Sequence, residues 1–348
     1  MPSWRCWSSS TMDGAAEPGL SRAGSPPRQP PSRSPINSGA MTRWRCWIPM
    51  PGCKLPKPSR RIRSERRIAM RIEHYAAKAP PAGLYDYGAQ VTSGSAGFAD
   101  VRDADIEQFH RLGFLVVHDA FAAAQVSAAR AGLHAALMRG GDNIIYEAAA
   151  RDQLPAWSQA QRLDSVRKLM PIIGNDARLQ ACAENPGLLD VVGRILGEQP
   201  ALSQDMALLK PPLIGREKPW HQDMAYFDYP AGTTIVGAWI ALDEALPENG
   251  CMMLIPGSHL EGPVLHWQRR DWQICDTDVP VGHSVAVPLR PGGCLLFHCL
   301  LQHGTPPSRS RRRRWALQFH YRRRSVQSLR DSAQRLQIFG ADGKDASC

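Results

Sequence analysis

The chain has 348 residues, 43% of them hydrophobic and 21% charged, which is enough for one large domain, or two small ones, with a buried core. No apolar run approaches the roughly 20 residues needed to span a bilayer, so the sequence excludes a transmembrane protein and predicts no membrane partner. The net charge of +10 comes from residues 1–70, which hold 13 Lys and Arg against 3 Asp and Glu; the rest of the chain holds 29 of each. This balance argues against a nucleic-acid partner.

Residues 1–70 do not have the pattern of a folded domain. They are rich in Pro, Ser and Arg and show no helical or strand periodicity, which predicts a disordered basic head. The near-repeat WRCW, at Trp4–Trp7 and Trp44–Trp47, leaves open stacking on nucleic acid. The Arg-rich and Ser-rich composition leaves open an organelle transit peptide. We favour a third interpretation, in which the native protein begins near Met70.

The nine cysteines form no CxxC pair. Their spacing therefore indicates neither a zinc site nor a disulfide framework, and most are expected to be small buried side chains. Because free cysteines are typical of a reducing compartment, we expect a cytoplasmic protein.

The body of the chain has a helical part and a strand-rich part. Before residue 200, periodicity and glycine stops predict a strand at 114–118 and helices at 103–112, 120–139, 177–184 and 186–196. After residue 200, short β-like runs follow at 202–209, 233–242, 251–255, 284–289, 294–298 and 315–321. This order predicts an α+β fold whose strands close into a sandwich or barrel. We expect a linker at 71–99, one domain at 100–325 and a C-terminal tail at 326–348.

The segment PWHQDMAYFDY, residues 219–229, carries candidate metal ligands. His221 and Asp223 are two residues apart, and side chains at this spacing point to the same side of a strand. A third ligand must come from elsewhere; His303 is the best candidate, and His298 competes with it. Two His and one carboxylate are the ligand set of non-haem Fe(II) oxygenases, although HxD also arises by chance.

Three sequence blocks resemble the phytanoyl-CoA dioxygenase family. They are ALLKPPLIGREKPWHQDMAYFDY, GAWIALDEALPENGCMMLIPGSH and GGCLLFHCLLQHGTPPSRSRRRRWALQFHY, and the resemblance runs from about residue 100 to about residue 325. It implies a double-stranded β-helix (jelly-roll, cupin-like) core with flanking N-terminal helices. It also implies an enzyme that uses Fe(II), 2-oxoglutarate and O2 to hydroxylate an unactivated C–H bond of a small-molecule substrate, with succinate and CO2 as co-products.

The resemblance also implies residue roles. His221, Asp223 and His303 would be the metal ligands, and Arg314, eleven residues after the last of them, would bind the far carboxylate of 2-oxoglutarate. A guanidinium can hold a carboxylate with two parallel hydrogen bonds. Trp315 replaces the second Arg of a common family ending and Ser308 stands where Asn is usual, so the choice between Arg314 and Arg312 stays open.

Three further residues match family positions near the cosubstrate, namely Thr305, Trp239 and Lys210. For Trp239 ordinary core packing explains the residue equally well, and for Lys210 so does an exposed surface position. We expect a substrate lid in residues 142–164, which are long and weakly periodic. His266 has no motif around it and is expected at the surface.

Three alternatives belong to different functional classes. The protein could be a non-catalytic jelly-roll binding protein that retains the metal ligands, or a metal-dependent isomerase or hydrolase on the same scaffold. The basic head could also give the chain a nucleic-acid role. The sequence leaves the substrate and the oligomeric state open.

Overall fold

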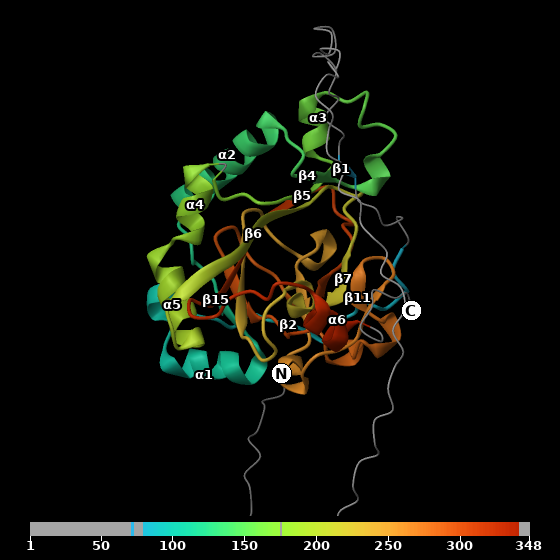
Figure 1. Cartoon of the computed structure of the whole chain (residues 1–348). Helices are drawn as coiled ribbons and strands as arrows, with labels where there is room; N and C mark the ends of the chain where they lie inside the picture. The colour runs from blue at the N-terminus through green and yellow to red at the C-terminus, as the bar shows by residue number, and fades with distance from the viewer. Residues whose placement is uncertain (1–70, 73–78, 175, 341–348) are drawn as a thin grey trace, which may run out of the picture. The chain divides into compact units, whose positions relative to one another are not determined.

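A computed structural model of the chain describes residues 71–72, 79–174 and 176–340 (Figure 1). The chain divides into Met1–Arg63 and Ser64–Cys348, and every described residue belongs to the second part. The predicted head at 1–70 and the last eight residues of the predicted tail therefore lie outside the described residues. Among the residues that are described, none of the helices is both long and apolar enough to cross a bilayer.

A large mixed sheet forms the centre of the fold, with the strand order β1-β4-β5-β6-β15-β8-β13-β3. Its strands are β1 (Arg71–Ile72), β3 (Phe114–Val117), β4 (Ile144–Tyr146), β5 (Val166–Leu169), β6 (Pro200–Lys210), β8 (Ile235–Ala241), β13 (Cys294–His298) and β15 (Arg314–Arg323). The long antiparallel pairs β15–β6 and β15–β8 place β15 in the middle of the sheet, so this strand is supported on both edges.

A second sheet has the order β2-β12-β9-β14-β7. Its strands are β2 (Ala89–Gln90), β7 (Lys218–His221), β9 (Met252–Leu254), β12 (Val285–Val287) and β14 (His303–Thr305), and a separate hairpin joins β10 (His266–Gln268) to β11 (Trp272–Ile274). Side chains of both sheets, such as Trp239 and Phe297 from the large sheet and Trp220 from the small one, share one apolar cluster. This two-sheet core confirms the predicted α+β jelly-roll fold.

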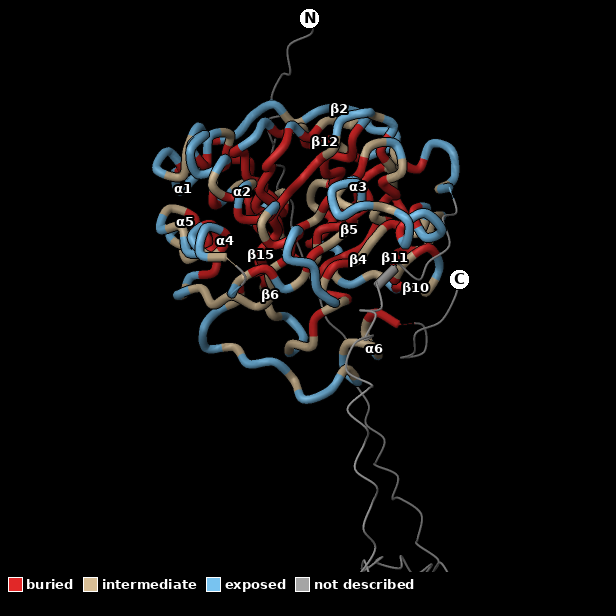
Figure 2. Tube along the Cα trace, turned by 90° about the horizontal axis from the view of Figure 1, so that it is seen from above, coloured by how far each residue is buried: buried red, intermediate tan, exposed pale blue. Residues whose placement is uncertain are grey.

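Four helices cover the other face of the large sheet: α1 (Asp103–Leu112), α2 (Ala123–Arg139), α4 (Ala177–Ala183) and α5 (Pro186–Leu196). Helix α3 (Gln159–Leu163) contacts α2, whereas α6 (Ala333–Phe339) packs through Phe339 in a separate apolar cluster with Met224 and Trp272. Figure 1 shows α1, α2, α4 and α5 gathered along one side of β6 and β15, and their apolar residues share a second cluster with the sheet. Figure 2 shows buried strands at the centre, with exposed parts of helices and loops around them.

Local sequence signals explain where the helices end. Helix α1 stops at Gly113, whose φ of 83° lies in the left-handed region that glycine adopts without strain. Helix α5 begins after Asn185, whose side chain accepts a hydrogen bond from the Leu188 amide at 3.1 Å, and has Pro186 as its first residue. These helices were predicted because such caps are encoded locally.

Short strands were missed by the sequence patterns. Strands β4, β5, β7, β10, β11 and β14 are only three or four residues long, which is too short to show a clear alternation of apolar and polar residues. Seven short 3-10 helices complete the described part: η1 (Phe98–Asp100), η2 (Ala148–Ala150), η3 (Asp223–Tyr226), η4 (Pro247–Asn249), η5 (Ser258–Glu261), η6 (Asp276–Asp278) and η7 (Val281–His283). In the region expected as a linker, Leu84 is buried and its carbonyl accepts a hydrogen bond from Trp220 Nε1 at 3.0 Å.

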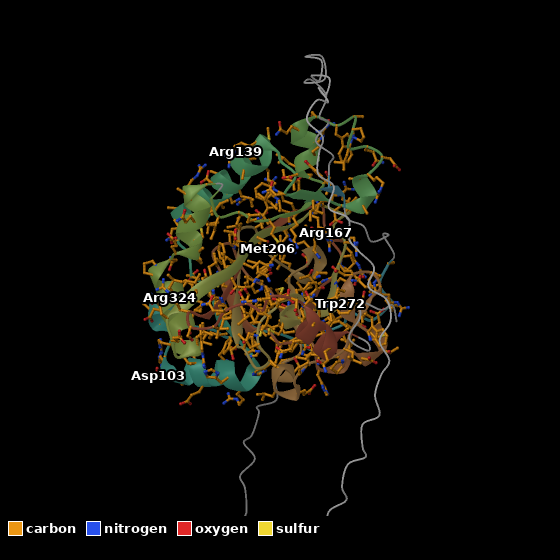
Figure 3. All side chains as sticks on the ribbon, in the orientation of Figure 1. Asp103, Arg139, Arg167, Met206, Trp272 and Arg324 are labelled. Atoms are coloured by element: carbon orange, nitrogen blue, oxygen red, sulfur yellow. The ribbon has the colours of Figure 1, made fainter. Side chains whose placement is uncertain are left out.

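Residues of β15 alternate between the two faces of the large sheet. Trp315, Leu317 and Phe319 join the cluster under the helices, whereas Arg314 and Gln318 line a cavity on the opposite face. Figure 3 shows Met206 of the neighbouring strand β6 toward the interior, with Asp103, Arg139 and Arg324 at the periphery. The inner face of β6 and β15 is thus one wall of the candidate site.

Candidate active site

Three buried side chains converge where the small sheet ends. His221 closes β7 and His303 opens β14, and the two residues are register partners in the antiparallel β7–β14 pair. Asp223 begins η3, one residue after the extended Gln222. One ligand atom from each of the three residues lies within 4.8 Å of the others. Asp223 Oδ1 is 3.3 Å from His221 Nε2 and 3.6 Å from His303 Nε2.

Both imidazoles are oriented in the same way by the backbone. His221 Nδ1 lies 2.7 Å from the Pro219 carbonyl oxygen, and His303 Nδ1 lies 2.8 Å from that of Leu301. Because a carbonyl only accepts, Nδ1 carries the proton in each ring and Nε2 presents its lone pair to the centre of the cluster. Burial lowers the pKa of His303 to about 3, which keeps this imidazole neutral and able to bind a metal.

Asp223 is not on a strand, in contrast to the expectation from the HxD spacing. Strand β7 ends at His221, but Gln222 keeps extended torsions, φ −113° and ψ 129°, so its two neighbours still project to one side. Gln222 is held by hydrogen bonds from its side-chain amide to the carbonyls of Gly262, at 2.9 Å, and Leu300, at 2.7 Å. These contacts stabilise the turn between the two candidate ligands.

His266 contradicts its predicted surface position. Its side chain is fully buried, and its Nε2 accepts a hydrogen bond from the backbone N–H of Gln222 at 3.0 Å. Burial lowers its pKa to about 3. No motif surrounds His266 in the sequence, so only its tertiary contacts reveal that it supports the Gln222 turn.

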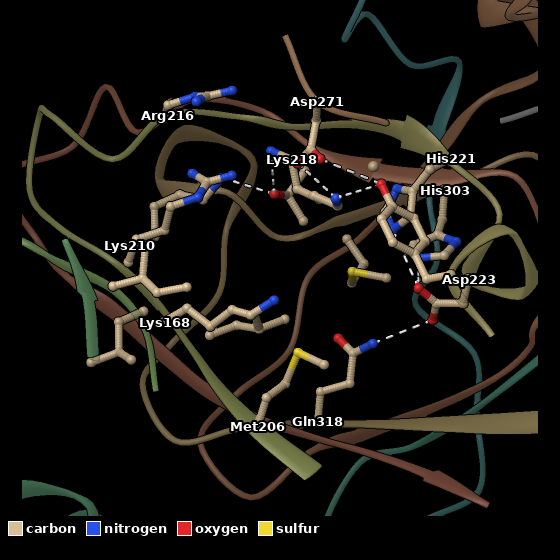
Figure 4. A pocket seen from close by; sticks show the side chains of 18 of the residues that line it. Lys168, Met206, Lys210, Arg216, Lys218, His221, Asp223, Asp271, His303 and Gln318 are labelled. Atoms are coloured by element: carbon tan, nitrogen blue, oxygen red, sulfur yellow. Dashed lines mark hydrogen bonds and ion pairs between the residues drawn. The ribbon is translucent and has the colours of Figure 1, made fainter. Parts of the chain in front are cut away.

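A cavity of about 320 Å³ opens beside the three converging residues (Figure 4). Its wall combines six cationic side chains, two carboxylates and several apolar groups. The cations are Arg167, Lys168, Lys210, Arg216, Lys218 and Arg314, and the carboxylates are Asp223 and Asp271. Ile145, from the segment expected as a lid, also lines the cavity. This excess of positive charge suits an anionic small molecule.

The structure distinguishes Arg314 from Arg312. Arg314 begins β15, is 2% exposed and lines the cavity, and its Nη1 donates to the Leu208 carbonyl at 3.0 Å. Its Nε has no hydrogen-bond partner among the described residues. Burial lowers its pKa to about 10, so it is still a cation at neutral pH. Arg312 lies before the strand on the surface, where its Nη1 pairs with Glu244 Oε2 at 2.7 Å.

Lys210 is a second buried cation beside Arg314, its register partner on β6. Its Nζ donates to Thr305 Oγ1 at 2.8 Å and to the Pro306 carbonyl at 2.6 Å. Burial and the nearby Arg314 hold the pKa of Lys210 well below its usual range. Neither cation pairs with a carboxylate of the described chain, so the pair fits an incoming carboxylate, as 2-oxoglutarate would supply.

Lys210 passes between two glycines. A Cβ on Gly215 would lie 2.5 Å from its Cγ, and a Cβ on Gly250 would lie 2.4 Å from its Cδ. Any other residue at these positions would close the passage through which the lysine stem reaches Thr305. The glycines therefore belong to the machinery that places this cation.

Trp239 and His298 lie outside the cavity wall. Trp239 on β8 is fully buried in the inter-sheet core, and its ring centroid is 5.1 Å from the Arg314 guanidinium carbon. The packing interpretation therefore suits it. The ring of His298 packs at a tilt against that of His259, with centroids 5.1 Å apart, away from the three converging residues.

Sequence reasoning missed a layer of donors behind Asp223. His320 Nε2 lies 2.8 Å from Asp223 Oδ2, and Gln318 Nε2 lies 3.3 Å from the same oxygen. Both residues follow Arg314 on the inner face of β15. The period-two pattern that groups Arg314 with Gln318 reaches His320 when it is extended by one step.

The geometry defines a class: a jelly-roll protein with a buried His-Asp-His cluster and a cationic pocket. The model of the phytanoyl-CoA dioxygenase (PhyH) family matches residues 109–316, which is more than half of the chain. The chain therefore belongs to the phytanoyl-CoA dioxygenase family. The resemblance seen in the sequence is confirmed.

Individual relatives are more distant. A probable phytanoyl-CoA dioxygenase of Caenorhabditis elegans is 29% identical over 174 residues, which cover 45% of this chain and 54% of the relative. The ectoine dioxygenase of Sphingopyxis alaskensis is 27% identical over 216 residues, which cover 57% of this chain and 68% of the relative. The chain spans about half the length of the phytanoyl-CoA dioxygenases that it matches.

Solved structures show the same fold. The crystal structure of EctD from S. alaskensis with 2-oxoglutarate and 5-hydroxyectoine superposes with a TM-score of 0.54 at 22% identity, covering 73% of this chain and 83% of that one. The crystal structure of a non-heme α-ketoglutarate-dependent carbocyclase from nogalamycin biosynthesis also superposes with a TM-score of 0.54. Its sequence identity is 20%, and the superposition covers 68% of this chain and 89% of that one.

Proposed function

We propose that the protein is an Fe(II)- and 2-oxoglutarate-dependent dioxygenase that hydroxylates an unactivated C–H bond of a small-molecule substrate. The observation that carries this proposal is that the His-Asp-His cluster opens onto the same cavity as Arg314 and Lys210, which have no carboxylate partner among the described residues. A metal site alone would suit many reactions. A metal site facing two buried cations without a carboxylate partner suits a metal-binding dianion.

The residues fit the two groups by their donor chemistry. His221 Nε2, His303 Nε2 and Asp223 Oδ1 would hold Fe(II), because two neutral imidazoles and one carboxylate leave half of the metal's positions for other ligands. Arg314, with its unpartnered Nε, and Lys210 would receive the far carboxylate of 2-oxoglutarate, with Thr305 beside them. When bound, Fe(II), 2-oxoglutarate and O2 supply the oxidising chemistry, with succinate and CO2 as products.

The rest of the wall receives the substrate. Arg167 and Lys168 of β5 and the ion pair between Lys218 and Asp271, at 2.7 Å, alternate with apolar groups such as Met206. The cavity is small and surrounded by charged groups, so it excludes a polymer and suits a compact polar molecule. The presence of Asp223 favours hydroxylation, because a halogenase of this kind needs a small residue there. The cytoplasmic location stays a prediction.

The test is anaerobic addition of Fe(II) and 2-oxoglutarate to the purified protein, followed by visible absorption. The wild type is expected to show a metal-to-ligand charge-transfer band. His221→Ala should abolish it, and Arg314→Ala should shift its appearance to much higher 2-oxoglutarate. Arg312→Ala is the matched control, because it removes an arginine two residues away that lies on the surface.

The outcome separates the alternatives. Folded, metal-loaded protein without a band, and without consumption of 2-oxoglutarate, would support a jelly-roll binding protein. Tight binding of zinc or nickel with no response to 2-oxoglutarate would support an isomerase or hydrolase.

A further inference from the structure

The two carboxylate oxygens of Asp223 face different partners. Oδ1 is the oxygen that lies near both imidazoles of the metal cluster, at 3.3 and 3.6 Å. Oδ2 points the other way, toward His320 Nε2 at 2.8 Å and Gln318 Nε2 at 3.3 Å. Figure 4 shows Gln318 directed at Asp223 from the opposite side to His221 and His303. The carboxylate is therefore divided between a metal-facing and a protein-facing oxygen.

The contacts determine which atom of His320 carries the proton. A carboxylate oxygen only accepts, so a lone pair on His320 Nε2 would repel Oδ2 at 2.8 Å. His320 Nδ1 is buried and has no partner among the described residues, so a proton there would lack an acceptor. The geometry thus assigns the proton to Nε2. With the proton on His320 Nε2, the Gln318 amide nitrogen 2.9 Å away cannot donate to that ring nitrogen, so the N–H groups of both residues are directed at Oδ2.

Both donors stand on a rigid support. His320 is 1% exposed and Gln318 is 5% exposed, and the strand that carries them pairs with β6 on one edge and β8 on the other. The His320 ring packs against Phe227, with centroids 4.9 Å apart, and faces Phe297 at 6.4 Å. Neither donor can follow Asp223 if the carboxylate rotates, so the contacts select one carboxylate orientation.

We infer that His320 and Gln318 are positioning residues that keep Oδ2 of Asp223 occupied, so that Asp223 offers the metal a single oxygen. A carboxylate bound through both oxygens would use a second metal position that the cosubstrate needs. This inference rests on the proposed function, because it gives Asp223 its role as a metal ligand. It assigns a role to two residues that do not reach the metal themselves.

The experiment is a titration of the metal-free full-length protein with Co(II), whose visible absorption reports coordination number. His320→Leu removes the donor, and His320→Gln retains a donor nitrogen at a similar reach. Removing a hydrogen bond to a metal ligand weakens metal binding by about 10- to 100-fold. We expect a loss of that size and an altered absorption spectrum in His320→Leu. The Co(II) affinity of His320→Gln should stay within about threefold of that of the wild type, with an unaltered spectrum, because glutamine still donates a hydrogen bond to Oδ2.

Gln318→Leu is the second variant, measured in the same way. It tests the inference even if His320→Leu does not fold by far-ultraviolet circular dichroism, and it should also weaken Co(II) binding and alter the spectrum. Wild-type affinity and spectrum in the folded leucine variants would overturn the inference. Equal losses in His320→Leu and His320→Gln would also overturn it, because ring packing would then be the cause. If the wild type and His221→Ala bind Co(II) alike, the proposed function fails instead.

Discussion

Gly237 of β8 lies directly against the ring of Phe297 of β13, its register partner. A Cβ on Gly237 would come within 2.4 Å of Phe297 Cζ, so the glycine supplies the space that this ring fills. The ring in turn packs between His303, at 4.8 Å between centroids, and His320, at 6.4 Å. The absence of one side chain thus places a ring between a candidate metal ligand and the histidine behind Asp223.

The first prediction follows from that contact. Gly237→Ala should destabilise the fold by about 1–3 kcal/mol, because overpacking displaces Phe297, and it should weaken Co(II) binding as His303 shifts. Urea unfolding and a metal titration measure the two effects. Gly282→Ala is the control, since a Cβ there meets no atom of the described residues within 4 Å. Equal behaviour of the two variants would contradict the steric argument.

The buried Lys210 predicts the direction in which the stability of the fold changes with pH. Its pKa in the folded protein is depressed by burial and by Arg314, whereas in the unfolded chain it is near 10.5. The charged form is therefore penalised in the fold at low pH, and this penalty is relieved as pH rises through the folded pKa toward the unfolded one. In the absence of 2-oxoglutarate, the stability of the wild type should gain on that of Lys210→Met as pH is raised from neutral toward 10. A pH-independent difference between the two variants would contradict a depressed pKa of Lys210 in the fold.

The position of Arg314 predicts that binding of 2-oxoglutarate requires the guanidinium group and not only a positive charge. Arg314→Lys retains a cation but loses the planar pair of donors, so the concentration of 2-oxoglutarate needed for half-saturation should rise by about tenfold or more. Fe(II) binding without cosubstrate should stay close to that of the wild type. Binding of 2-oxoglutarate is measured anaerobically from the charge-transfer band. Wild-type cosubstrate affinity in Arg314→Lys would show that a point charge is sufficient.

The hairpin behind the cavity contains a buried ionic network. Arg270 donates through Nε to Glu217 and through Nη1 and Nη2 to Asp276, at 2.6 and 2.7 Å, and Tyr85 also donates to Glu217, at 2.5 Å. Arg270→Met would leave two carboxylates without this cation, one of them the buried Glu217, and should destabilise the protein by about 3–5 kcal/mol. The comparison is Arg312→Ala, which breaks an exposed pair and should cost less than about 1 kcal/mol. Denaturant unfolding of both variants gives the difference, and similar losses would contradict the burial argument.

The fold class and the cluster of candidate ligands could be predicted from local signals. The caps of α1 and α5 are encoded by Gly113, Asn185 and Pro186, and the long strands β6, β8 and β15 show apolar runs. The side chains of His221 and Asp223 still point to the same side although β7 ends at His221, because Gln222 between them is extended. The roles assigned to these side chains stay predictions until a metal is titrated.

The sequence by itself determined which residue types could bind a metal and which positions of β15 share a face, because both depend on spacings of a few residues. Only the tertiary structure decided which arginine is buried, since β15 begins at Arg314 and leaves Arg312 in solvent. It also brought His320 to Asp223 across 97 residues and buried His266 under the Gln222 turn. These relations depend on strand register and on which sheet face is covered, and neither is encoded in a local pattern.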